Sequence, residues 1–99
     1  MLLFQKYTDS SLLGVWKIDE SIEELLSFLE SKDISYFNIF NLKAKSKIQE
    51  KLAVRVLLKH LLKEEVDILY LPSGKPYLKT HQKYISISHT KGYVAVILT

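Results

Sequence analysis

The sequence predicts an α+β fold in which a small, mostly antiparallel sheet packs against one long central helix. Short runs of β-type residues lie near both ends of the chain, whereas the middle holds a long segment with helical periodicity. Glycine-containing turns separate the last strands. Because no linker, repeat or low-complexity tract divides the 99 residues, we expect a single domain, 1–99.

The composition is that of an ordinary globular domain, with 47% hydrophobic and 25% charged residues, and it excludes a largely disordered chain. Zero cysteines exclude a disulfide framework and any thiolate metal site, which fits a reducing cytoplasm. Residues 1–6 lack the apolar stretch of a signal peptide, and no run approaches the length of a membrane span. We therefore expect a cytoplasmic protein that does not enter the membrane.

The net charge is +3, and the only arginine among the fourteen basic residues is Arg55. A mild basic excess favours anionic partners such as nucleotides, acidic carrier proteins or nucleic acid. A single arginine and the lack of a recognition-motif pattern disfavour a small nucleic-acid-binding domain. We expect no nucleic acid among the partners.

The first half of the chain predicts two strands and a helix. Residues 2–6 and 14–18 are short β-type runs separated by the polar residues 8–11, which indicates a hairpin or meander. Residues 19–21, Asp-Glu-Ser, open a helix that has acidic residues in its first turn, presents one apolar face and ends at 31–33. The aromatic-rich residues 34–41 are interpreted as a short helix or an ordered loop, and Trp16 as a core residue.

The long helix is expected from about residue 43 to residue 63. From Leu52 onward it is apolar nearly all round, so it is either central to the fold or part of an interface. Arg55 emerges from these apolar residues, so we expect it to pair with a buried carboxylate or to reach an anion. Glu50 is a poor partner for Arg55 because five residues place it about 140° away around the helix.

Three strands are expected in the second half, at 67–71, 84–88 and 93–98, with Lys91-Gly92 as the hairpin tip between the last two. Isoleucine and serine alternate in 85–88, which predicts a strand with one buried face. Apolar residues fill almost every position of 93–98, which predicts a strand covered on both faces.

The turn at Gly74-Lys75-Pro76 is a candidate anion or base site. Gly74 can adopt a positive φ, and Pro76 biases Lys75 toward an extended backbone. The lysine side chain is then held by a stiff turn, which suits it to hold a phosphate or cover a nucleotide base. The alternative is a solvated lysine on an ordinary β-turn.

The end of the strand at Ser88-His89 is a second candidate. Ser86 and Ser88 lie on one side of a strand and His89 on the other, unless the chain turns there. The imidazole can donate to phosphate oxygens, or it can simply cap the hairpin by bonding a carbonyl. A Ser–His nucleophile is disfavoured, because there is no Gly-x-Ser-x-Gly motif and no carboxylate is placed to orient the imidazole. We expect Lys75 and the Ser88–His89 pair to lie close together around a phosphate-rich ligand.

The start of the long helix carries further lysines. The helix dipole favours anions at this end, and the lysines add to the attraction, although a solvated face is the alternative. These lysines are Lys43, Lys45 and Lys47. His60 and His81 are expected at the surface, and the three scattered histidines do not form a metal site.

Four motifs occur in a fixed order along most of the chain. They are Glu-x-Leu-Ala-x-Arg-x-Leu-Leu at 50–58, Gly-Lys-Pro-x-Leu at 74–78, Ile-Ser-Ile-Ser-His-Thr at 85–90 and Tyr-Val-Ala-Val at 93–96. Together with residues 13–18, this set resembles the N-terminal half of the 4′-phosphopantetheinyl transferases of the surfactin-synthetase-activating type. The resemblance implies one half of the pseudo-dimer fold of these enzymes, in which two similar halves enclose coenzyme A.

The family's implied activity is the magnesium-dependent transfer of the phosphopantetheine arm of coenzyme A to a serine of an acyl or peptidyl carrier protein. The resemblance implies that Lys75, Ser88 and His89 contact the nucleotide end of the coenzyme, including its 3′-phosphate. Basic residues at the start of the long helix assist, and they map onto Lys43, Lys45 or Lys47.

The chain departs from the family pattern in one respect. The magnesium-binding Asp-x-Glu belongs to the second half of such enzymes and is absent here, so we expect the chain to be inactive alone. We expect it to form a homodimer or to associate with a missing second half. The alternative is a non-enzymatic, dimerising interaction module of the same fold.

Overall fold

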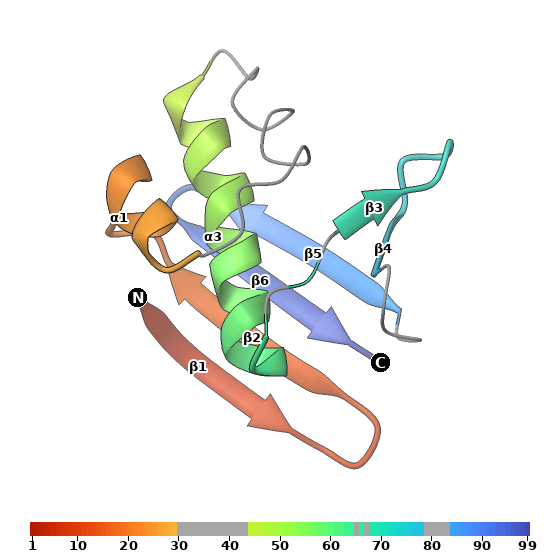
Figure 1. Cartoon of the computed structure of the whole chain (residues 1–99). Coiled ribbons are helices and arrows are strands. Elements are labelled where there is room, and N and C mark those ends of the chain that lie inside the picture. The colour runs from red at the N-terminus through yellow and green to blue at the C-terminus, as the bar shows by residue number, and fades with distance from the viewer. Residues whose placement is uncertain (30–43, 65, 67, 79–83) are drawn as a thin grey trace.

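The computed structural model describes residues 1–29, 44–64, 66, 68–78 and 84–99 (Figure 1). The predictions for residues 34–41, Lys43 and His81 lie outside these ranges. Apart from the short strand Pro76–Leu78, which the sequence did not predict, the helices and strands follow the expected order along the chain. They are β1 (Leu2–Tyr7), β2 (Leu12–Lys17), α1 (Ile22–Ser27), α3 (Lys45–Leu62), β3 (Ile68–Tyr70), β4 (Pro76–Leu78), β5 (Ile85–Thr90) and β6 (Tyr93–Leu98).

The main sheet has four antiparallel strands in the order β1-β2-β6-β5. The N-terminal hairpin therefore pairs with the C-terminal strand, as Figure 1 shows. Lys91 and Gly92 connect β5 to β6, and Gly92 has a φ of 81°, which confirms the predicted hairpin tip. A sheet of antiparallel strands with one long helix confirms the predicted α+β class.

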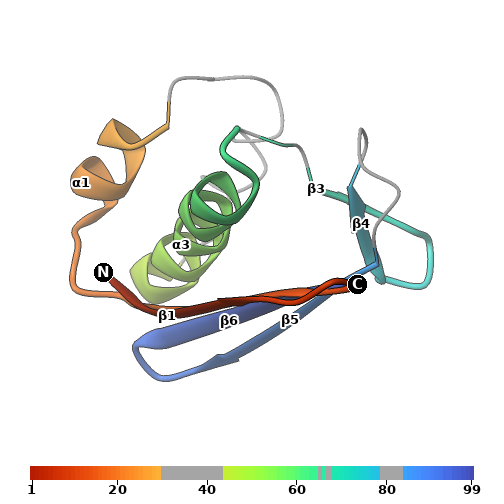
Figure 2. The same ribbon diagram turned by 90° about the horizontal axis from the view of Figure 1, so that it is seen from below.

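Both described helices lie on the same side of this sheet (Figure 2). Gly14 allows α3 to approach β2 closely, since a Cβ atom at this position would lie 2.7 Å from Cδ1 of Leu57 and 3.0 Å from Cδ1 of Leu61. The hydrophobic core fills the space between α3 and the sheet, and Trp16, Val96 and Leu98 are buried there. The sheet thus has one face covered by helices, which we call the inner face.

The helix α3 is central to the fold. Every residue from Leu52 to Leu58 is buried, and so is Leu61. The helix begins at Lys45 after Ala44, which makes no side-chain cap, and it ends before Lys63, whose φ is 64°. The apolar residues of α3 are therefore covered by the chain itself, which agrees with the first of the two alternatives, a helix central to the fold. No helix in the described ranges is long and apolar enough to cross a membrane.

The last strand differs from the prediction. Val94, Val96 and Leu98 are buried on the inner face, but the alternate residues Tyr93 and Ile97 are exposed. The expectation that β6 is covered on both faces is wrong, because no described helix lies on the other side of the sheet. Apolar composition alone does not distinguish a strand with two covered faces from one with an exposed apolar face.

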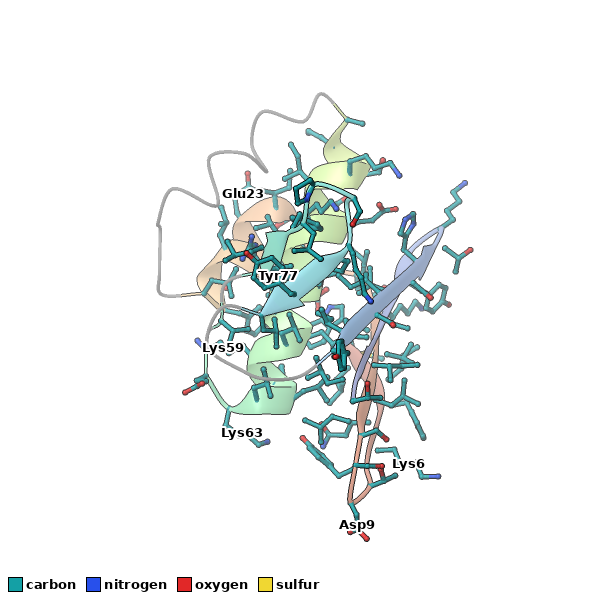
Figure 3. The ribbon with its side chains drawn as sticks, turned by 90° about the vertical axis from the view of Figure 1, so that its right-hand side faces the viewer. Lys6, Asp9, Glu23, Lys59, Lys63 and Tyr77 are labelled. Atoms are coloured by element: carbon teal, nitrogen blue, oxygen red, sulfur yellow. The ribbon has the colours of Figure 1, made fainter. Side chains whose placement is uncertain are left out.

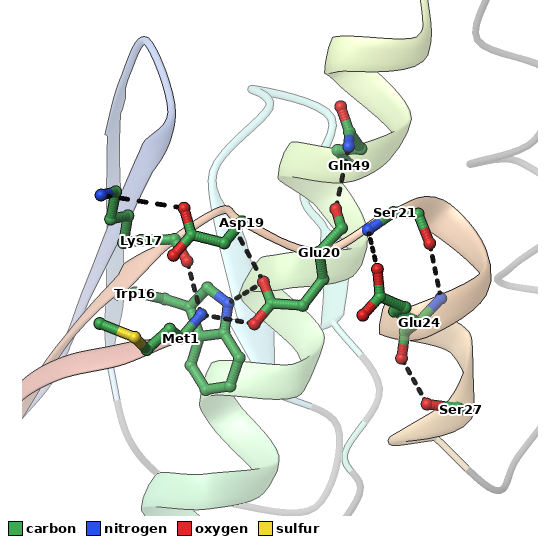
Figure 4. Close-up of polar contacts among 9 residues, drawn as sticks. All are labelled: Met1, Trp16, Lys17, Asp19, Glu20, Ser21, Glu24, Ser27 and Gln49. Carbon is green, nitrogen blue, oxygen red and sulfur yellow. Dashed lines mark hydrogen bonds and ion pairs between the residues drawn. The ribbon is translucent and has the colours of Figure 1, made fainter.

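A polar network fastens the first strand to the start of α1 (Figure 4). The Glu20 carboxylate accepts hydrogen bonds from the Met1 ammonium at 2.6 Å and from the Trp16 indole N–H at 3.1 Å. The main-chain carbonyl of Glu20 accepts a hydrogen bond from the Gln49 side chain of α3 at 3.0 Å. Partial burial alone would raise the pKa of Glu20, but the hydrogen bonds from the ammonium and the indole, a backbone hydrogen bond and the ammonium charge together hold that pKa below 4.5.

Two short strands, β3 and β4, form a separate ribbon beside β5. The turn between them contains Gly74 with a φ of 90°, and the N–H of Leu71 donates to the carbonyl of Lys75 at 2.9 Å. A bridge between Tyr77 and Tyr84 connects the ribbon to the chain just before β5. The ribbon holds Lys75 near the start of β5.

Candidate functional site

Three polar side chains meet where the first turns of α3 pass the end of β5. Oε1 of Glu50 lies 3.6 Å from Nδ1 of His89, and Oε2 lies 3.4 Å from Nζ of Lys47. The Glu50 side chain is 17% exposed, whereas those of His89 and Lys47 are 51% and 53% exposed. We call these three residues the His89 cluster: a shielded carboxylate holds two basic groups that face solvent.

Local geometry explains why these residues meet. Lys47 and Glu50 are three residues apart on α3, so they share one side of the helix. His89 pairs in register with Val94, whose side chain is buried on the inner face, so the imidazole lies on the side of the sheet that faces α3. The cluster is therefore fixed by one helix and one strand end.

Ser88 does not join this cluster. It pairs with Ala95, and the alternation along β5 places its hydroxyl on the opposite face of the sheet from His89. The alternation therefore separates the two side chains, and the hydroxyl and the imidazole do not bind one ligand atom together. Only the main chain of Ser88, on an edge strand, is near the cluster.

Lys75 does not join the His89 cluster either. Its ammonium is 5.5 Å from the centre of the Tyr84 ring, which is 74% exposed. Tyr84 precedes His89 by five residues of extended chain, so their Cα atoms lie about 17 Å apart at about 3.4 Å per residue. Lys75 and His89 therefore occupy opposite ends of β5, and a single phosphate does not fit between them.

Of the remaining predicted lysines, one belongs to the His89 cluster and one lies near it. Lys45 is the first residue of α3 and is exposed, one turn before the His89 cluster. Lys47 belongs to the cluster, and Lys43 lies outside the described residues. Ala44 at the start of α3 makes no side-chain cap hydrogen bond, and the positive end of the helix dipole adds to the attraction for an anion.

Sequence reasoning missed the carboxylate. It found none placed to orient the imidazole, and the structure corrects this with Glu50, which is 39 positions away in the chain. Glu50 opens the motif at 50–58, but its partner is set by the packing of α3 on β5, which no local spacing reveals. No serine hydroxyl is hydrogen-bonded to His89 in the described ranges, so the cluster is not arranged as a nucleophile site.

Arg55 is buried on α3, as its apolar neighbours indicated. The Glu50 carboxylate contacts Lys47 and His89. Among the described residues, no group of three or more histidine, aspartate or glutamate side chains could hold a metal ion. These residues do not fit the magnesium site that the family resemblance implies, and no step proposed below uses a metal.

Comparisons with known proteins leave the family open. The chain matches no family model and no curated protein.

Proposed function

We propose that this domain binds the nucleotide end of coenzyme A as the N-terminal half of a 4′-phosphopantetheinyl transferase of the surfactin-synthetase-activating type. The ordered motifs at 50–58, 74–78 and 85–90 support the proposal. The observation that carries it is the His89 cluster, because the imidazole and the Lys47 ammonium lie together beside the start of α3.

A phosphate at this cluster would contact the exposed sides of Lys47 and His89. Glu50 lies on their shielded side, so its carboxylate positions both groups without contacting the ligand itself. With Nδ1–H directed at Glu50, Nε2 is the imidazole nitrogen that remains, and in the protonated ring its N–H donates to a phosphate oxygen. Lys45 adds a second ammonium from the first turn of the helix.

The pair formed by Lys75 and Tyr84 suits the base of the same ligand. An exposed aromatic ring offers a stacking surface, and the nearby ammonium attracts an electron-rich base or a phosphate. Since this pair and the His89 cluster lie at opposite ends of β5, an elongated ligand fits both, whereas inorganic phosphate fits only one. Coenzyme A is elongated and carries both a base and phosphates.

The isolated chain would bind the coenzyme and not transfer its arm. Neutralising a pyrophosphate and activating a serine hydroxyl require carboxylates that hold a metal ion, and the described residues offer no such group. The complete enzyme would act in the cytoplasm on an acidic acyl or peptidyl carrier protein. Mass spectrometry of an apo carrier protein, incubated with the chain, coenzyme A and magnesium, should show no added phosphopantetheine.

A two-dimensional NMR titration tests the binding site. Adding adenosine 3′,5′-bisphosphate should shift the amide signals of residues 45–50 and 88–90, and adenosine without phosphates should leave these signals unchanged. A Lys63→Gln variant is the control: this exposed lysine lies at the far end of α3, so its replacement should leave the shifts at residues 45–50 and 88–90 as they are in the unaltered chain. Shifts restricted to other parts of the chain would refute the proposed site.

The second candidate function is a non-enzymatic interaction module of the same fold. The exposed apolar residues Tyr93 and Ile97 on β6 favour it. The titration above distinguishes the two, since such a module would self-associate without binding the nucleotide.

A further inference from the structure

The side of the sheet that faces away from α3 is unusually apolar at its centre; we call it the outer face. Gly14 and Trp16 point toward α3, so Leu13, Val15 and Lys17 of β2 lie on the outer face. Figure 3 shows Lys6 of β1 extending from this face, away from both helices. The outer residues of the other two strands follow from the same alternation: Tyr93, Ala95 and Ile97 of β6, and Ser86, Ser88 and Thr90 of β5.

The strand register arranges these residues in three rows across the sheet. Each row runs over β1, β2, β6 and β5 in turn, and the third begins at β2. The rows are Lys6–Leu13–Ile97–Ser86, Phe4–Val15–Ala95–Ser88 and Lys17–Tyr93–Thr90. The two central strands are apolar in the first two rows, the β1 edge bears a lysine and a phenylalanine, and the β5 edge bears only hydroxyl groups.

An antiparallel sheet that faces water on one side normally alternates apolar and polar residues. Here the outward positions of β2 and β6 are apolar except for Lys17, and Ile97 and Phe4 are 43% and 48% exposed. A contiguous apolar area with a polar rim is characteristic of an interaction surface. No described helix covers it (Figure 2).

We propose that the outer face binds the outer face of a second copy of this chain, through a two-fold axis parallel to the strands and midway between β2 and β6. This axis places each row over the same row of the second copy in reverse order. Leu13 then lies over Ile97 of the second copy, and the larger Val15 lies over the smaller Ala95. An axis across the strands would instead place Val15 over Val15 and Ala95 over Ala95, which crowds one point and leaves a gap at the other.

The edges are complementary under the same axis. The Lys6 side chain of one copy lies over Ser86 of the other, so its ammonium can donate to a hydroxyl. The Phe4 ring lies over Ser88, where a small side chain leaves room for it. Lys17 lies over Tyr93, whose ring face attracts a cation. The outer strand positions bear no carboxylate, so no negative charge is buried by this contact.

The size of the face predicts a weak dimer. Four strands about 4.8 Å apart and six residues of about 3.3 Å give a projected area of roughly 20 by 20 Å. Stable complexes bury about 800 Å² per partner, so this face of roughly 400 Å² lies below the usual size of a stable interface. We expect a dissociation constant on the order of micromolar. The His89 cluster lies on the inner face, so dimerisation and nucleotide binding are independent of each other.

Sedimentation equilibrium between about 5 and 300 μM tests the dimer. The mass should rise with concentration from that of the 11.5 kDa chain toward twice that value. Ile97→Lys should abolish the increase, because it places a charge at the centre of the contact. Leu71→Lys, at a residue that is 45% exposed on the β3–β4 ribbon, should leave the increase unchanged. A monomer at every concentration would overturn the proposal, and so would an Ile97→Lys variant that still dimerises while retaining its circular dichroism spectrum.

Cross-linking tests the direction of the axis. The chain has no cysteine, so single cysteines are unambiguous. In the proposed dimer Lys6→Cys of one copy faces Ser86→Cys of the other, whereas two copies of either variant place their cysteines about 14 Å apart across three strand spacings. A short bismaleimide should therefore link the mixture of the two variants and neither variant alone. Equal linking of Lys6→Cys with itself would overturn this arrangement.

Discussion

Oε1 of Glu50 lies 3.6 Å from Nδ1 of His89, and this contact joins the first half of α3 to the last part of β5. The carboxylate is largely shielded from solvent, whereas the imidazole is half exposed. Glu50 therefore acts as a positioning residue: it fixes the orientation of the ring while leaving its other nitrogen free for a ligand. The same carboxylate also contributes negative charge close to the proposed phosphate position.

The first prediction concerns this charge. Glu50→Gln should tighten binding of adenosine 3′,5′-bisphosphate by about three- to tenfold, because a unit charge about 4 Å from a phosphate opposes binding by about 1 kcal/mol even at the dielectric of water. The amide can still accept a hydrogen bond from His89 or Lys47, so the ring should keep its position. Isothermal titration calorimetry measures the change, with the exposed Glu23→Gln as the control. Weaker binding by Glu50→Gln would show that the ionised carboxylate is needed to position His89.

The second prediction separates the two ends of the ligand site. His89→Gln should weaken binding of both coenzyme A and inorganic pyrophosphate, because the imidazole contacts phosphate oxygens. Tyr84→Ala should weaken binding of coenzyme A by about tenfold and leave pyrophosphate binding unchanged, because loss of a base–aromatic stack costs about 1–3 kcal/mol. Calorimetry with both ligands gives the four values. Equal losses with pyrophosphate for both variants would mean that Tyr84 does not mark the base end.

Most elements of the fold, though not the three-residue strand β4, were predictable from local pattern. The alternation of isoleucine and serine in β5 and the two-residue turn at Lys91–Gly92 each determine their own conformation, and the structure agrees with both. The strand order was not predictable, because the pairing of β2 with β6 joins segments that are about eighty residues apart. Such a pairing depends on total burial and leaves no periodic signal of its own.

In the candidate site, too, local pattern predicted part of the arrangement and long-range packing decided the rest. Alternation along β5 correctly placed Ser88 and His89 on opposite faces, yet the predicted grouping with Lys75 required the path of the β3–β4 ribbon. The Glu50–His89 contact required the angle at which α3 crosses the sheet. Residue types therefore identified the basic groups, and tertiary packing decided which of them meet.

The third prediction concerns the contact between β2 and α3. Gly14→Ala should destabilise the fold by about 1–2 kcal/mol, because the new methyl group would lie 2.7 Å from Cδ1 of the fully buried Leu57. Urea unfolding of the single variants and of Gly14→Ala/Leu57→Ala forms a double-mutant cycle. The cost of Gly14→Ala should largely disappear in the Leu57→Ala background, where space is available. Additive costs would show that the clash is not with Leu57.

The last prediction is a pH dependence that originates at Glu20. Its pKa in the folded chain is below 4.5, so the folded state binds the proton less readily than the unfolded state. The stabilisation from the ionised carboxylate is therefore fully present above about pH 4.5 and is lost as the pH falls through the folded pKa.

Glu20→Gln removes the ion pair with the Met1 ammonium and weakens the bond from Trp16, and it should cost about 1–2 kcal/mol at pH 7. Urea unfolding from pH 7 to pH 3 should show the two stability curves converging at the acid end. Asp9→Asn, which alters an exposed carboxylate between β1 and β2, should run parallel to the unaltered chain throughout. A constant gap between Glu20→Gln and the unaltered chain down to pH 3 would mean that the carboxylate acts through packing and not through its charge.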